Sequence, residues 1–161
     1  MQITGMLHGS RLLEFVEFPS AEILGPDASE EAIKAMIERH GSVFVKPVFK
    51  GGVGKKGKAG LMGHAKDLKA ALAEKERLYF VEHRHGKQIA KANGVTFEGA
   101  VPAEHEVYCS LSLSTEFRAP TLTITHCGGM AIEEVDEKQI ARVPFDALTG
   151  MKSFVVANAL V

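Results

Sequence analysis

The chain has 161 residues, 45% of them hydrophobic, which is enough apolar material for a sizeable core and excludes a disordered tail. Lysine and arginine (19) nearly balance aspartate and glutamate (20), so the formal charge of -1 creates no global field that would favour nucleic acid or an anionic membrane. No apolar run approaches the roughly 20 residues of a membrane span, and Cys109 and Cys127 have neither disulfide-framework nor zinc spacing. We therefore expect a cytoplasmic protein with no nucleic-acid or membrane partner.

The first half of the chain predicts alternating helices and strands. Residues 11–24 are an ambiguous apolar run, interpreted as a short helix and a strand. Residues 27–41 predict a helix, because Ile33, Met36 and Ile37 recur at helical spacing, Ser29 or Asp27 can cap it and Gly41 can end it. Residues 42–49 predict a strand from their β-branched and aromatic content, and residues 65–76 predict a second amphipathic helix.

The second half is predicted to be mostly β. Strands are expected at residues 78–86, 95–101, 104–114 and 121–129, separated by connections at residues 87–94, 102–105 and 115–120. The tail from residue 138 is expected to contain one short strand, a turn at residues 146–150 and the beginning of a helix.

A loop rich in glycine and lysine separates the 42–49 strand from the second helix. Residues 51–60 contain five glycines and three lysines, so the backbone can approach an anion closely while the lysines supply charge. This composition favours a polyphosphate, and a solvated surface turn is the alternative. Residues 52–59 approach the Walker A pattern, but Ala59 lacks the hydroxyl that would reach a metal, so a P-loop is a minor interpretation.

Lys46 is a single charged residue in the otherwise apolar 42–49 strand. If both faces of the strand are buried, its ammonium group must face a cleft or pair with an anion, because burying it unpaired is costly. If one face is wet, Lys46 is an ordinary alternating polar residue. Further along, Glu98 and Glu106 flank an apolar stretch whose backbone could hydrogen-bond an adenine edge, with a carboxylate following for ribose hydroxyls. Taken alone, that stretch is a strand connection with solvated glutamates.

The order of five motifs carries a family resemblance. They are "FVKP" (44–47), "GKKGKAG" (54–60), "FEGAVPAEHEVY" (97–108), "HCGGMAIEEVDE" (126–137) and "VPFDALTG" (143–150). From about Gly41 onward, this order resembles the nucleotide-binding region of the ATP-grasp subunits of ADP-forming acid–CoA ligases, which include succinyl-CoA synthetase, ATP citrate lyase and citryl-CoA synthetase. The resemblance implies an α+β, ATP-grasp-like fold of two small α+β lobes with mostly antiparallel sheets. One ATP-grasp domain would cover residues 1–161, with lobes at roughly 1–97 and 98–161, and would be incomplete at its C-terminus.

The resemblance also implies which residues bind ATP. Lys46 would contact a phosphate, and Lys56, Gly57 and Lys58 would lie in a loop that closes over it. Glu98, Gly99 and Val101 would form a hinge that meets adenine. Glu106 would bind the ribose. Glu133 and Glu134 would lie in a loop facing the phosphoryl-transfer region, with solvated acids after a Gly-Gly turn as the alternative. No catalytic residue and no metal ligand is assigned within this chain.

The implied function is that of a ligase. ATP phosphorylates a histidine on a CoA-binding partner domain or subunit, the phosphoryl group passes to a carboxylate such as citrate or succinate, and CoA takes the acid as a thioester. The Mg²⁺ ligands are expected outside this chain, because the family's E-x-N-P-[LM] segment has no match here. We therefore expect the isolated chain to be inactive and to work in an oligomeric assembly. The alternative is a non-catalytic nucleotide-binding or assembly module that lacks the metal site.

Overall fold

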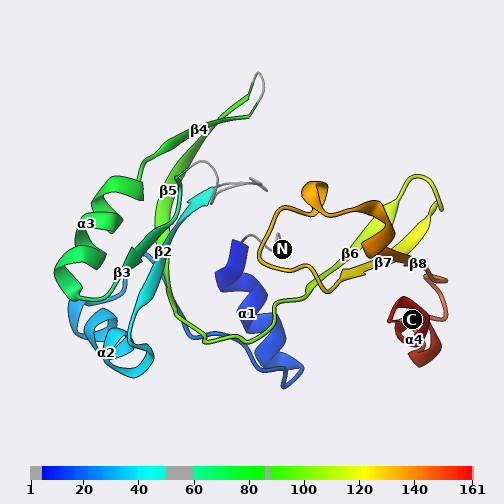
Figure 1. Ribbon diagram of the computed structural model, residues 1–161. Helices are drawn as coiled ribbons and strands as arrows, with labels where there is room; N and C mark the ends of the chain where they lie inside the picture. The colour runs from blue at the N-terminus through cyan, green and yellow to red at the C-terminus, as the bar shows by residue number, and fades with distance from the viewer. Residues whose placement is uncertain (1–4, 50–59, 86–87, 161) are drawn as a thin grey trace. The chain divides into compact units, whose positions relative to one another are not determined.

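The computed structural model describes residues 5–49, 60–85 and 88–160 (Figure 1). The chain divides into two units, Met1–Pro102 and Ala103–Val161. The first contains α1 (Gly5–Phe15), β1 (Ile23–Leu24), α2 (Glu30–His40), β2 (Val43–Phe49), β3 (Gly63–Ala65), α3 (Leu68–Leu78), β4 (Glu82–His85) and β5 (Gln88–Gly99). The second contains β6 (Tyr108–Ser114), β7 (Ala119–Thr125), two short 3-10 turns, β8 (Ala141–Pro144) and α4 (Ser153–Ala159).

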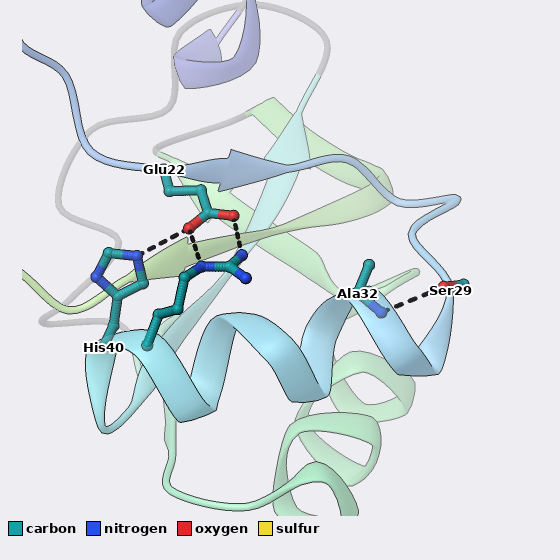
Figure 2. A network of polar contacts seen from close by, with 5 residues as sticks. Glu22, Ser29, Ala32 and His40 are labelled. Atoms are coloured by element: carbon teal, nitrogen blue, oxygen red, sulfur yellow. Dashed lines mark hydrogen bonds and ion pairs between the residues drawn. The ribbon is translucent and has the colours of Figure 1, made fainter.

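Helix α2 forms where the sequence predicts it, with both expected ends. The Ser29 side chain accepts a hydrogen bond of 3.2 Å from the Ala32 backbone N–H (Figure 2). Gly41 ends the helix with a left-handed φ of 74°, and its N–H donates to the Ile37 carbonyl at 2.7 Å. The apolar residues Ile33, Met36 and Ile37 are buried, and their burial packs α2 against the sheet of the first unit.

The sheet of the first unit has the strand order β1-β5-β2-β3, with β4 paired to β5. Every pairing in it is antiparallel. Helices α2 and α3 lie along the same face of this sheet (Figure 1). The core between the helices and the sheet consists of Ile33, Met36, Ile37, Val43, Val45, Phe49, Leu61, Ala65, Ala71, Leu78, Ala92, Val95 and Phe97.

The predicted connection at residues 87–94 is wrong, because that segment lies almost wholly within β5. The predicted 78–86 strand is shorter than expected and corresponds to β4, because α3 continues to Leu78. Glutamine, lysine and alanine have weak strand propensity, but pairing with β4 supplies their backbone with partners. The register of β2 on β5 shifts between Pro47 and Phe49, so β5 also accommodates a bulge near Gly94.

The second unit is a three-stranded antiparallel sheet in the order β6-β7-β8, with α4 against β7 and β8 (Figure 1). The predicted 104–114 strand begins only at Tyr108, because the Glu106 carbonyl instead accepts a bond from the Gly128 N–H at 3.0 Å. The predicted turn at residues 146–150 is present. Asp146 Oδ1 accepts from the backbone N–H of Leu148 (2.9 Å) and Thr149 (2.8 Å), and these bonds lower the pKa of Asp146.

The prediction of an α+β fold with mostly antiparallel sheets is therefore confirmed. Among the described residues, no helix is long and apolar enough to cross a membrane.

Phe97→Ala is expected to lower the free energy of unfolding by about 3–5 kcal/mol, because a fully buried aromatic ring would leave a cavity between β5 and the helices. Urea denaturation followed by circular dichroism measures this. The matched control is Phe15→Ala on α1, where the ring is 86% exposed and the change should stay within about 0.5 kcal/mol. Equal losses for the two variants would contradict this assignment of the core.

Candidate functional site

Strand β2 has one buried face and one half-buried face. Val43, Val45, Pro47 and Phe49 are buried in alternation with Phe44, Lys46 and Val48. Antiparallel register places Phe44 opposite Glu98 and Lys46 opposite Thr96 on β5. Directly paired residues share a face of the sheet, so these four side chains lie together on the face turned away from the core. We call this face, defined by Phe44, Lys46, Thr96 and Glu98, the Lys46 face.

Lys46 and Glu98 form an ion pair at the centre of the Lys46 face. The Lys46 ammonium group donates to Glu98 Oε2, and the Thr96 hydroxyl donates to Glu98 Oε1 at 3.2 Å. The Glu98 side chain is only 6% exposed, whereas that of Lys46 is 30% exposed. A buried carboxylate needs such partners, because leaving it unpaired costs far more than the interaction itself provides. Lys46 thus combines the two predicted possibilities: it alternates with apolar residues, and it also pairs with an anion.

An aromatic pair borders the ion pair. The Phe44 ring stacks on the His64 ring of β3 with centroids 4.9 Å apart and an interplanar angle of 28°. The Lys46 ammonium group lies 6.0 Å from the centroid of the Phe44 ring. The Lys46 face therefore offers a cation and a flat apolar surface side by side, a combination that suits a ligand carrying both phosphate and an aromatic base.

The predicted adenine hinge lies at the end of β5. Glu98 and Gly99 are the last residues of the strand and are buried, and Val101 is exposed two residues later. The Gly99 N–H donates to the Glu22 carbonyl at 3.0 Å, and the Ala100 N–H donates to the Ser42 carbonyl at 3.1 Å. The structure therefore brings Lys46 and the start of the hinge together, since Glu98 belongs to both.

A second charged cluster, which includes Glu22 and His40 (Figure 2), lies beside the hinge, because the Gly99 N–H donates to the Glu22 carbonyl. Arg39 Nη2 donates to Glu22 Oε1 at 2.5 Å and Arg39 Nε to Glu22 Oε2 at 3.2 Å, and His40 Nε2 lies 2.8 Å from Glu22 Oε2. Arg39 and His40 are the last two residues of α2, where cations are favoured by the helix dipole. The bonds from Arg39 first, and from His40 second, hold the pKa of Glu22 below its ordinary value of 4.5.

Glu106, the predicted ribose ligand, lies in the second unit. Its side chain is exposed, and its carboxylate lies so close to Gly129 that a Cβ there would overlap it. Gly129 has a left-handed φ of 71°, a conformation that favours glycine. Within this unit, the structure thus brings Glu106 to the Gly-Gly turn that precedes Glu133 and Glu134, which lie in the 3-10 turn Ile132–Glu134.

The remaining predicted ATP-binding residues, Lys56, Gly57 and Lys58, lie outside the described part of the chain. The described end of the same loop is anchored to α3: Arg77 Nη1 donates to the Gly60 carbonyl at 3.0 Å, and Arg77 Nη2 pairs with Glu74 at 2.6 Å. Among the described residues, no group of three or more His, Cys, Asp or Glu could hold a metal ion.

Sequence reasoning assigned Lys46 and Glu98 to different parts of a ligand and missed their direct contact. It also missed the Phe44–His64 stack and the cluster around Glu22. The single charge in the apolar run "VFVKPVF" was a usable signal, since it singles out Lys46. No sequence signal joined Lys46 to Glu98, because they are 52 positions apart and meet only through strand register.

Comparisons with known proteins agree with the motif order. A family model described as "ATP-grasp domain" matches residues 10–161. The chain is 30% identical over 111 residues to the beta subunit of an ADP-forming succinate–CoA ligase from Desulfurococcus amylolyticus, in a match that covers 67% of this chain and 28% of that protein. It also superposes on a solved structure of ATP citrate lyase from Methanothrix soehngenii, in complex with citrate and coenzyme A, with a TM-score of 0.56 and 20% identity. That match covers 87% of this chain and 32% of the other.

These matches confirm both the resemblance indicated by the motifs and the ATP-grasp fold. The chain spans less than a third of the length of the curated relative.

Lys46→Met and Glu98→Gln are expected to be strongly non-additive in stability. Each single variant leaves a charged or polar partner without its counterpart, whereas the double variant removes both. We expect a coupling energy of about 1–2 kcal/mol from a double-mutant cycle in urea. The exposed pair Lys34–Glu38, 4.0 Å apart on α2, is the control and should give about 0.5 kcal/mol or less. Additive effects at Lys46 and Glu98 would show that the pair contributes nothing.

Arg39→Ala is expected to raise the pKa of Glu22 toward 4.5, because it removes the interaction that lowers this pKa most. A lowered folded-state pKa contributes stability above pH 4.5, and this stability is lost as the pH falls through the folded pKa. The wild-type chain should therefore lose stability to acid more steeply than Glu22→Gln. Carboxyl-carbon NMR titration gives the pKa, and acid denaturation gives the slope. A Glu22 pKa that does not move in Arg39→Ala would contradict the assignment.

Proposed function

Because the chain belongs to the ATP-grasp domain family, we propose that it binds ATP, with the phosphates at Lys46 and the adenine at the segment from Glu98 to Val101. The observation that supports this most directly is the Lys46–Glu98 ion pair on the Lys46 face. A lysine that is half-buried, oriented by a buried carboxylate and followed along the chain by a glycine- and lysine-rich loop has the features of a phosphate contact.

The ion pair explains how Lys46 is held ready for a phosphate group. The ammonium group has three N–H donors, and Glu98 Oε2 uses one of them. The other donors can serve phosphate oxygens while the carboxylate keeps the side chain from extending into solvent. Thr96 supports this arrangement because its hydroxyl satisfies the second Glu98 oxygen at 3.2 Å. Glu98 is then a positioning residue for Lys46 as well as part of the hinge.

The other ATP contacts are proposed from the motif matches. Lys56, Gly57 and Lys58 would close over the phosphates, and the exposed Glu106 carboxylate would accept hydrogen bonds from the ribose hydroxyls. Backbone N–H groups and lysine ammonium groups together offset phosphate charge, which is the main requirement of phosphoryl transfer. The Mg²⁺ ion that accompanies ATP is proposed to be bound by other residues of the same enzyme.

We further propose that this nucleotide site serves an acid–CoA ligase. The γ-phosphoryl group of ATP would pass to a histidine nitrogen on a CoA-binding partner domain or subunit, leaving ADP. A carboxylate oxygen of citrate or succinate would then displace the histidine from phosphorus, and the CoA thiol would displace phosphate from the acyl carbon to form the thioester. The relationship to the succinate–CoA ligase subunit supports this class of reaction. That the 161-residue chain alone forms no thioester stays a prediction.

Lys46→Ala is expected to lower the affinity for the non-hydrolysable analogue AMP-PNP by about tenfold or more, the equivalent of one charge-assisted hydrogen bond. Isothermal titration calorimetry measures the affinity. Lys34→Ala, an exposed lysine on α2, is the control that should leave binding unchanged. Lys46→Arg keeps the charge and the pair with Glu98, so it separates loss of phosphate contact from loss of stability.

Two outcomes would contradict the proposal. Failure of the wild-type chain to bind AMP-PNP would overturn nucleotide binding by this chain. Unchanged affinity in Lys46→Ala, with the wild type binding measurably, would overturn the role of Lys46.

A further inference from the structure

The cluster of Glu22, Arg39 and His40 has no role in the ATP contacts described above, yet it lies against the hinge. Its members come from two elements, the segment before β1 and the C-terminal end of α2 (Figure 2). The Glu22 side chain is 34% exposed and that of His40 is 26% exposed, so neither is required by the hydrophobic core.

Glu22 is bonded to the hinge through its backbone and to α2 through its side chain. Its carbonyl accepts the Gly99 N–H at 3.0 Å, while its carboxylate is held by both Arg39 and His40. The next hinge amide, that of Ala100, donates to the Ser42 carbonyl just after α2 ends. The hinge is therefore linked to the C-terminal end of α2 at Gly99, through Glu22, and at Ala100, through Ser42.

The His40 ring packs directly on Gly99. A Cβ added at Gly99 would lie 2.6 Å from His40 Cδ2, 2.8 Å from Cγ and 2.9 Å from Nε2, so any side chain there would force the ring to shift. Gly99 is therefore a place where backbone and imidazole meet face to face. The hydrogen bond to Glu22 fixes the orientation of the ring, and the ring in turn limits how far the Gly99 backbone can move.

These contacts determine which backbone group is left for a ligand. The N–H groups of Gly99 and Ala100 are both occupied within the protein. In the described part of the chain, the Val101 N–H donates to no other group, and Val101 is exposed. Adenine presents a ring-nitrogen acceptor beside an amino donor, so it needs one N–H and one carbonyl at a set spacing. A hinge held at Gly99 and Ala100 would offer the Val101 N–H and a neighbouring carbonyl at a defined position.

We propose that Glu22 and His40 are positioning residues that hold the hinge backbone at Gly99 and Ala100 in the geometry required to bind the adenine base. This inference rests on the proposed nucleotide binding and adds to it the residues that fix the base subsite. Neither residue touches the nucleotide. Their effect is preorganisation, because the ligand does not have to order the hinge itself.

The test compares two probes, AMP-PNP and inorganic tripolyphosphate, by isothermal titration calorimetry on the full 161-residue chain. His40→Ala and Glu22→Ala should lower the affinity for AMP-PNP by about tenfold, the equivalent of one net hydrogen bond, and leave the affinity for tripolyphosphate unchanged. Lys46→Ala should lower the affinity for both probes. Glu38→Ala, on the same helix with a side chain 67% exposed, is the control and should change neither.

Two further variants separate positioning from a general structural role. His40→Gln keeps a donor within reach of Glu22 and should recover much of the AMP-PNP affinity. In a background of His40→Ala, Gly99→Ala should cost no additional affinity, because the ring that its Cβ would meet is gone. Backbone amide exchange measured by NMR should show faster exchange at Gly99 and Ala100 in His40→Ala, with the core of β2 unchanged.

The outcomes are distinct. If the wild-type chain binds neither probe, the proposed function fails and this inference fails with it. If the wild-type chain binds both probes and His40→Ala and Glu22→Ala weaken them equally, or weaken neither, nucleotide binding stands and the positioning role is overturned.

Discussion

The antiparallel pairing of β2 with β5 is the constraint on which the rest of the first unit depends. Register sets Val45 opposite Phe97 on the core face and Lys46 opposite Thr96 on the other. Because side chains alternate along a strand, a slip of one residue would either turn the Lys46 ammonium group toward α2 and α3 or expose Phe97, depending on which strand is displaced. Burial of the apolar face therefore also determines that Lys46 and Glu98 meet, and no separate interaction is needed to bring them together.

The energetic balance of that pair is informative about function. Removing the Glu98 carboxylate from water is costly, and the Lys46 ammonium and Thr96 hydroxyl groups offset this cost. An apolar pair of similar volume would stabilise the sheet at least as well, so an ion pair at this position is poor evidence of a purely structural role. A lysine whose charge is retained and oriented beside a stacked aromatic pair is better suited to an anionic ligand that also has an apolar part.

The end of β5 shows a second way in which packing prepares a site. The His40 ring packs on buried Gly99, whose N–H donates a hydrogen bond to the Glu22 carbonyl. Close packing of this kind leaves few alternative backbone positions, because displacing the ring would also break its contact with the Glu22 carboxylate. In the second unit, the Glu106 carboxylate likewise lies close to the Gly129 backbone.

The sequence by itself determined the elements whose signals are local. Helix α2 followed from its apolar spacing, Ser29 cap and Gly41 stop, strand β2 from its β-branched residues, and the 146–150 turn from Asp146. The motif order was sufficient to identify the fold, since each motif is a contiguous stretch. Lys46 could be singled out because a charge in an apolar strand requires an explanation.

Only the tertiary structure decided what depends on pairing between distant segments. Residues 88–91 became strand because β4 pairs with them. The Lys46–Glu98 pair and the packing of His40 on Gly99 each join residues more than fifty positions apart. Strand register joins segments that lie far apart in the sequence, and together with the alternation along each strand it decides which side chains share a face. For that reason the sequence could propose residues for a site, but it could not show the contacts among them.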